Sequence, residues 1–191
     1  VDLTTKGSAA LDYEDVYTES SEQPLPVALG YLTFDGTQYL KFPDEAALDL
    51  TTWVIIDAVV KTDASALNNP AAIVAKNVDG DTCASPYNAY FLKQNNGQFQ
   101  FATTADYGTR FLAVDTEDSV SSDWVRVTGV WSSSSDSRMG EGKMSLYVDG
   151  VLVGEKTQGD ELLVTTGSLW VGKGCGNYFT GAIKELHVWG E

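Results

Sequence analysis

The sequence predicts an all-β fold in which two antiparallel sheets stack as a β-sandwich, a jelly roll. No stretch repeats apolar residues at helical spacing, whereas short runs of β-branched and aromatic residues recur between Gly, Asp and Asn. About fourteen such runs occur, a number that two stacked sheets accommodate. Asp-Gly and Asn-Gly turns join neighbouring runs. The expected strands span residues 9–17, 28–34, 38–42, 52–60, 71–76, 88–93, 98–103, 110–114, 124–132, 143–149, 151–156, 161–164, 168–172 and 182–190.

The hairpin around Asp149-Gly150 shows how alternation assigns faces. Successive side chains of a strand point to opposite sides of the sheet. Met144, Leu146 and Val148 therefore share one face, which we expect to pack in the core.

The hairpin at 96–97 is of the same type. Phe99 and Phe101 share one face of its second strand, and Gln98 and Gln100 share the other. We expect the glutamine face to be polar and accessible to a ligand.

Length and hydropathy predict one domain over residues 1–191. Of these residues 43% are hydrophobic, which is enough for a single core. Residues 1–27 are acidic and irregular and contain Pro24 and Pro26, so we expect them to pack on the domain as a loop or an edge. No apolar run is long enough to insert in a membrane. The N-terminus lacks the pattern of a signal peptide, which suggests a mature or excised chain.

The charge restricts the partners. The sequence has 27 acidic and 12 basic residues, a net charge of −15. This balance repels phosphate backbones and anionic membrane surfaces, so it disfavours nucleic acid as a partner. It equally favours a neutral ligand over an anionic one.

The two cysteines, Cys83 and Cys175, both lie in stretches rich in Gly, Ser and Asn. Such loops allow the side chains to meet in one disulfide bond, and two unpaired thiols are the alternative.

Four segments, in order along the chain, carry a family resemblance. They are LTFDGTQYLKFP (32–43), WVRVTGVW (124–131), MSLYVDGVLVGE (144–155) and GAIKELHVW (181–189). Together they resemble the concanavalin A-like lectin/glucanase superfamily, in particular its laminin G-like and pentraxin-like branch. The resemblance covers about residues 28–190 and implies a jelly roll with a concave sheet and rim loops for ligands. Lys184 stands where many relatives carry Asp, which argues against carrying over a metal site.

A catalytic centre is not evident in the sequence. Glycoside hydrolysis requires a pair of carboxylates, and the E-x-D-x-x-E pattern of β-glucan hydrolases with this fold is missing. The only histidine, His187, lies inside the last expected strand, where packing is its expected role. We therefore expect a protein that is not an enzyme.

One segment has the composition of a calcium site. Asn77, Asp79 and Asp81 place oxygen atoms at alternate positions of an expected exposed loop, with Gly80 for tight curvature. Ca²⁺ prefers such ligands, and an ordinary acidic turn is the alternative.

Aromatic and planar polar side chains at strand ends are the candidate ligand contacts, because they bury sugar faces and bind hydroxyl groups. These candidates are Tyr87, Tyr90, Tyr107, Arg110, Asn177 and Tyr178. Four tryptophans alternate with apolar residues and are expected in the core: Trp124, Trp131, Trp170 and Trp189.

These features predict a non-catalytic, extracellular carbohydrate-binding domain, secreted or at the cell surface. It would recognise a neutral polysaccharide through aromatic side chains of loops and of the concave face, and would belong with other domains to a larger extracellular protein. A laminin G-like adhesion domain is the first alternative, and a glycoside hydrolase or polysaccharide lyase is the second.

Overall fold

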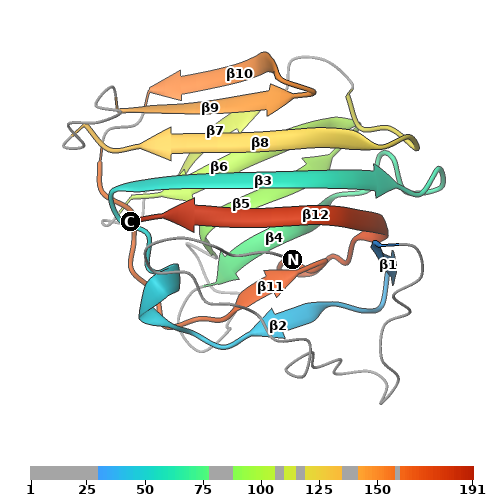
Figure 1. Ribbon diagram of the computed structural model, residues 1–191, viewed down its shortest axis with the longest axis horizontal. Helices are drawn as coiled ribbons and strands as arrows, with labels where there is room; N and C mark the ends of the chain where they lie inside the picture. Colours follow the sequence, from blue (N-terminus) through green and yellow to red (C-terminus); the bar gives the residue numbers. More distant parts are fainter. Residues whose placement is uncertain (1–29, 78–87, 106–109, 115–118, 135–141, 158–159) are drawn as a thin grey trace.

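The computed structural model describes residues 30–77, 88–105, 110–114, 119–134, 142–157 and 160–191. In these residues the chain forms two antiparallel sheets of six strands each, stacked face to face (Figure 1). None of their helical turns is long and apolar enough to cross a membrane. The predicted two-sheet antiparallel sandwich is confirmed.

The first sheet contains the first and the last described strands. Its spatial order is β1 (Leu32–Asp35), β12 (Thr180–Gly190), β3 (Trp53–Thr62), β8 (Val125–Ser132), β9 (Lys143–Val148) and β10 (Val151–Thr157).

The second sheet lies behind the first in Figure 1. Its order is β2 (Leu40–Phe42), β11 (Leu169–Val171), β4 (Ala71–Asn77), β5 (Asn88–Asn95), β6 (Gln98–Thr104) and β7 (Arg110–Val114). A 3-10 turn, Ala46–Leu48, follows β2.

Two of the expected strands are not observed as strands in the described residues. The strand expected at 9–17 lies outside the described residues. The segment 161–164 forms only an isolated bridge between Leu162 and Ala105. Its amides bond outside any ladder, from Leu162 to Thr51 and from Leu163 to Thr104, so no regular strand forms there.

The core lies between the sheets and takes one face of each. Met144 and Leu146 are wholly buried in it, and Val148 is buried at its margin, as predicted. Phe99 and Phe101 enter it from the second sheet. The expected alternation of these two hairpins is therefore confirmed. The expected accessibility of the glutamine face is not, because Gln100 is buried and Gln98 is only partly exposed.

The tryptophans divide between the core and the surface. Trp131 is in the core, as predicted. Trp124 is 38% exposed, so its predicted core position is wrong. Trp189 is only partly buried and stacks on His187, with ring centroids 5.0 Å apart. Trp170 is buried but lies outside the core cluster.

Strand alternation explains why three tryptophan rings lie outside the core in which we expected them. Val125 and Val188 occupy the inward positions beside Trp124 and Trp189, so the indoles point outward. Trp170 lies between Leu169 and Val171, which both face the core, so its ring also lies on the outer face.

Gly129 is a point of close approach between the two sheets. A Cβ atom at this position of β8 would lie 2.5 Å from the ring of Phe101 on β6. We predict that Gly129→Ala lowers the free energy of unfolding by about 2 kcal/mol, because the ring has to move within a packed core. Urea denaturation measures the loss. Adding Phe101→Leu should restore part of it, and a Gly129→Ala protein as stable as the parent would contradict this packing.

Candidate functional site

The outer face of the second sheet carries a small apolar cluster of its own. Ala72, Ala75, Phe91 and Ala102 are buried there, apart from the main core. The register places Ala75 opposite Phe91, and Phe91 opposite Ala102, on three adjoining strands. One aromatic ring, 4% exposed and surrounded by alanines, forms an apolar floor.

This floor belongs to a surface depression of about 360 Å³, which we call the sheet depression. Its lining residues are Pro70, Ala71, Ala72, Ala75, Asn88, Phe91, Lys93, Gly174, Cys175 and Asn177. The ammonium of Lys93 lies 5.1 Å from the centroid of the Phe91 ring. Lys93 is the one charged side chain among these lining residues, and Asn88 and Asn177 add two amides. The site thus combines an aromatic floor with a polar rim.

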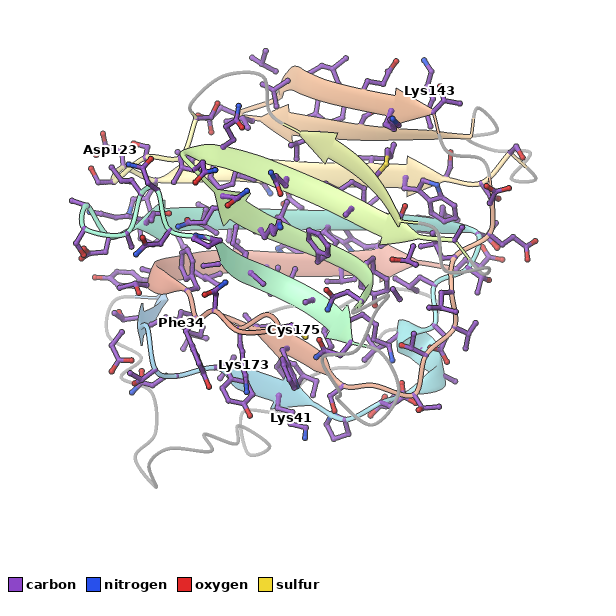
Figure 2. The ribbon with its side chains drawn as sticks, turned by 180° about the vertical axis from the view of Figure 1, so that it is seen from behind. Phe34, Lys41, Asp123, Lys143, Lys173 and Cys175 are labelled. Atoms are coloured by element: carbon purple, nitrogen blue, oxygen red, sulfur yellow. The ribbon has the colours of Figure 1, made fainter. Side chains whose placement is uncertain are left out.

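A tight loop after β11 forms one wall of the depression. Gly174 donates a backbone hydrogen bond of 2.9 Å to Asn177, and a bridge joins Lys173 to Tyr178. Asn177 is exposed at the tip of this loop. Figure 2 looks onto the second sheet and shows Lys173 and Cys175 together on its β11 side.

Three aromatic rings next to the depression surround Lys173. Its ammonium lies 4.0 Å from the ring centroid of Tyr39, 4.3 Å from that of Trp170 and 5.3 Å from that of Tyr178. Trp170 is the register partner of Ala75, so the rings adjoin the apolar floor. The Tyr178 side chain, a predicted ligand contact, packs on Lys173 and remains partly exposed.

A buried lysine fixes β11 in the second sheet. Lys76 has no solvent exposure, and its ammonium donates to the Asp44 carboxylate, to the Gly167 carbonyl at 2.6 Å and to the Thr165 carbonyl at 3.2 Å. Burial raises the pKa of the nearby Asp49 carboxyl, and the charge of Lys76 opposes that rise. The network ties the approach to β11 onto β4, and thereby positions the loop that walls the depression.

Tyr90 lies in the core and not at the ligand surface where we expected it. Its side chain is 1% exposed, and its hydroxyl donates to the Leu48 carbonyl at 2.9 Å. Burial, together with nearby Asp49 and Asp44, raises the pKa of Tyr90 far above its usual range. Phe91, the next residue, takes the outward position.

Asn77 also differs from expectation. It ends β4 wholly buried, and not in an exposed loop. Its side chain donates to the Ser168 carbonyl at 3.1 Å and accepts from Asn88 at 2.9 Å, so its amide group is already engaged within the fold. Asp79 and Asp81 lie outside the described residues. Calcium binding by these two aspartates stays a prediction, without Asn77 as a suitable ligand.

The remaining predicted residues are only partly described. Tyr87, Tyr107 and Cys83 lie outside the described residues, and Arg110 is described only as the first residue of β7. Cys175 is not a free thiol. Its pairing with Cys83 stays a prediction.

Sequence reasoning missed Phe91 and Lys93. The run AYFLK is apolar on both faces of β5, so alternation alone did not show which of Tyr90 and Phe91 points inward. The three alanines beside Phe91, Ala72, Ala75 and Ala102, give a weak signal, because small side chains on an outer face leave room beside a ring.

A polar cluster on the outer face of the first sheet centres on Asp57. This carboxylate accepts from Arg126 Nη2 at 2.6 Å and from the Thr128 hydroxyl at 2.6 Å. Arg126 also lies 3.5 Å from Glu185. Burial by itself raises the pKa of Asp57, but the bonds from Arg126 and Thr128 bring it below its ordinary value. The cluster joins β3, β8 and β12 by charge and hydrogen bonds.

Two six-stranded sheets around one core define a concanavalin A-like β-sandwich. A family model described as the concanavalin A-like lectin/glucanases superfamily, of the laminin G type, matches residues 34–191. The chain belongs to this superfamily. No curated protein sequence matches it.

Several solved structures share the fold at low sequence identity. The chain is similar to a heptameric SAP-like pentraxin from Limulus polyphemus, with 16% identity, a TM-score of 0.50 and coverage of 94% of this chain and 78% of that one. It is similar to the CBM40 module of a Ruminococcus gnavus IT-sialidase bound to α2,3-sialyllactose, with 13% identity, a TM-score of 0.58 and coverage of 83% and 89%. It is also similar to a mutant of HCR/D, with 14% identity, a TM-score of 0.63 and coverage of 99% of this chain and 48% of that one.

The buried lysine network makes a first prediction for this site. Lys76→Met should lower the free energy of unfolding by about 2 kcal/mol, because two carbonyls and a partly buried carboxylate lose their donor. Hydrogen exchange at Leu169–Val171 should accelerate, since β11 loses its tie to β4. Lys156→Met, on the exposed strand β10, is the matched control and should change neither measurement. Equal stability of the two variants would contradict the role of Lys76.

The Asp57 cluster makes a second, pH-dependent prediction. Because its folded pKa is lowered, Asp57 contributes its full stabilisation above its unfolded pKa of about 3.9, and loses it as the pH falls through the folded pKa. Asp57→Asn should cost about 2 kcal/mol at pH 7, and the difference from the parent should shrink below about pH 4. Urea denaturation across this range measures both values. A difference that does not change with pH would contradict the ionic role of Asp57.

Proposed function

We propose that this domain is a non-catalytic carbohydrate-binding domain that binds a neutral sugar in the sheet depression. The observation that carries the proposal is the outward ring of Phe91, surrounded by alanines and rimmed by Asn88, Lys93 and Asn177. An apolar floor with a few convergent polar groups is the usual composition of a small-ligand site. The volume of about 360 Å³ suits one or two sugar residues.

The chemistry of the lining fits a sugar. The C–H face of a pyranose packs on an aromatic ring, as apolar groups generally do. The exposed amide of Asn177 both donates and accepts, and the Lys93 ammonium donates, so they match hydroxyl groups. The Asn88 amide already donates to Asn77 and lies at the buried side of the rim. Among the similar structures, one is by name a carbohydrate-binding module. A net charge of −15 favours neutral over anionic chains.

Binding without catalysis is supported by the same lining. Glycoside hydrolysis requires two carboxyl groups on either side of the bond that is cleaved. The described residues that line the depression include neither Asp nor Glu. Asp57 and Glu185 lie near each other on the first sheet, but Arg126 is paired with both.

We further infer an extracellular location, secreted or at the cell surface, as one module of a larger protein. A Cys83–Cys175 disulfide would suit an oxidising compartment. Since Cys175 lines the depression, this bond would also fix the wall that carries Asn177. Electrophoresis with and without reductant tests the pairing.

A laminin G-like protein-interaction domain is the second candidate, favoured by the family model that matches. Calcium held by Asp79 and Asp81 would then support a rim contact with a partner protein. Binding that requires Ca²⁺ and is insensitive to changes in the sheet depression would identify this function.

The test is retention on a panel of immobilised neutral polysaccharides, with parallel assays for released sugars. We expect retention without products, and binding weakened about three- to tenfold by Phe91→Leu and by Asn177→Ala, since ring and amide contacts each contribute roughly 0.5–1.5 kcal/mol. Lys156→Ala is the control and should bind like the parent. Chelator should not alter retention at this depression.

Two results would contradict the proposal. One is unchanged binding by Phe91→Leu and Asn177→Ala proteins that remain folded. The other is release of reducing ends or unsaturated sugars, which would identify an enzyme.

A further inference from the structure

A second hollow lies on the opposite sheet. It has a volume of about 550 Å³ and occupies the end of the first sheet where β1 and β12 begin and β3 ends. Figure 2 shows Phe34 and Asp123 at this end of the sandwich and Lys143 at the other. We call it the end groove.

The floor of the end groove follows from strand register. Thr33, Ala182 and Lys61 are paired in one row across β1, β12 and β3. Phe34 and Val60 face the core, so Thr33 and Lys61 point outward. The small side chain of Ala182 between them leaves the hollow open.

Two aromatic rings wall the groove. Trp124 precedes β8, and Tyr31 precedes β1, three strands away in the sheet. Their attachment points are therefore about 14 Å apart. Nevertheless the ring centroids lie 5.4 Å apart in an edge-to-face arrangement, so the side chains reach toward each other across β12 and β3. Each ring restricts the other, and the Trp124 indole remains 38% exposed.

Trp124 is unusual for its environment. Among the residues whose exposure the structure describes, it is the one aromatic side chain in the exposed class. It adds nothing to the core, because Val125 takes the inward position next to it. An exposed indole held in place beside a hollow is a surface on which a flat apolar ligand face can stack.

The far end of the groove is polar and rigid. Asp35 is paired with Thr180, and the amide of Asp63 donates to the Thr180 carbonyl at 3.0 Å, so the two carboxylates flank one residue. Asp35 Oδ1 accepts from the amide and the hydroxyl of Thr37, at 2.8 and 2.7 Å. Asp63 Oδ1 accepts likewise from Ser65, at 2.9 and 2.6 Å.

The two carboxylates give this end of the groove a negative charge. The hydrogen bonds from Thr37 lower the pKa of the Asp35 carboxyl, and those from Ser65 lower the pKa of the Asp63 carboxyl. Both groups are therefore ionised at neutral pH, and Lys61 is the one cation in the described lining. Fixed carboxylates accept hydrogen bonds from hydroxyl groups and repel anions.

We propose that the end groove is a second sugar-binding site, specific for a neutral glycan, with Trp124 as its stacking surface and Asp35, Asp63 and Lys61 as its hydroxyl-binding groups. Because the sheet depression and the end groove lie on opposite sheets, one domain engages two glycan segments at once. The groove volume lies in the usual range for small-ligand sites. The assignment of a sugar as ligand rests on the proposed function. The residues and contacts that form the end groove are separate from those of the sheet depression.

Calorimetric titration with four neutral hexasaccharides, cellohexaose, laminarihexaose, xylohexaose and mannohexaose, counts the sites. The parent domain should bind two molecules of at least one probe. Trp124→Ala should bind one, with the affinity of the remaining site unchanged. Tyr147→Ala removes a partly buried aromatic side chain from the same outer face, outside the groove, and should still bind two.

Two further measurements distinguish loss of the binding site from misfolding of the Trp124→Ala variant. Lys61→Gln alters an exposed side chain and should weaken the groove site about three- to tenfold. In the parent, bound hexasaccharide should protect tryptophan fluorescence from acrylamide, because Trp124 is the exposed indole. The protection should disappear in Trp124→Phe.

The two sites are separated by their variants. If the parent binds one molecule, and Phe91→Leu weakens this binding while Trp124→Ala does not, the end groove is refuted and the sheet depression stands. If Trp124→Ala abolishes binding and Phe91→Leu does not, the end groove stands and the assignment of the depression is wrong. If no hexasaccharide binds the parent, both are refuted.

Discussion

The alternation of side chains along β-strands is the constraint on which this structure depends. Each sheet must bury one face against the other, so inward positions of both sheets carry Val, Ile, Leu, Met and Phe residues that form one core. Packing is so close that the ring of Phe101 occupies the space that a Cβ atom at position 129 would need. A large side chain on an outer face therefore does not contribute to this core, so its presence there needs a different structural or functional reason. Phe91, Trp124 and Asp57 are three such residues, and each marks a distinct feature of the surface.

The second sheet differs from the first in having an apolar patch on its outer face. Phe91 and its alanine neighbours form the floor, and the Lys76 network holds β11 so that the loop with Asn177 closes one side. The first sheet instead uses charge on its outer face, where Arg126 pairs with Asp57 and Glu185. The fold thus supplies a rigid frame, and the chemistry comes from a few outward residues, as is usual for a fold that serves many functions.

Much of the fold was predictable because it depends on local patterns. Hairpin turns and alternation placed Met144, Leu146, Phe99 and Phe101 in the core, and the strands lie near their expected bounds. The site was less predictable. Where both faces of a strand are apolar, the sequence does not show which of two neighbouring side chains points into the core, as at Tyr90 and Phe91. Trp124 looked like a core residue because it begins a strand motif, but a strand end leaves its first side chain free to point outward. Lys76 gave no signal, since its carbonyl partners are about ninety residues away in sequence.

Amide chemical-shift mapping by NMR tests the central claim most directly, namely that the outer face of the second sheet binds sugar. The probe is the neutral oligosaccharide that binds most tightly, titrated into the isotope-labelled domain. We predict that the amides of Ala72, Ala75, Phe91 and Asn177 shift together, with one common dissociation constant. Saturation of the domain while these four amides remain unmoved would contradict the account.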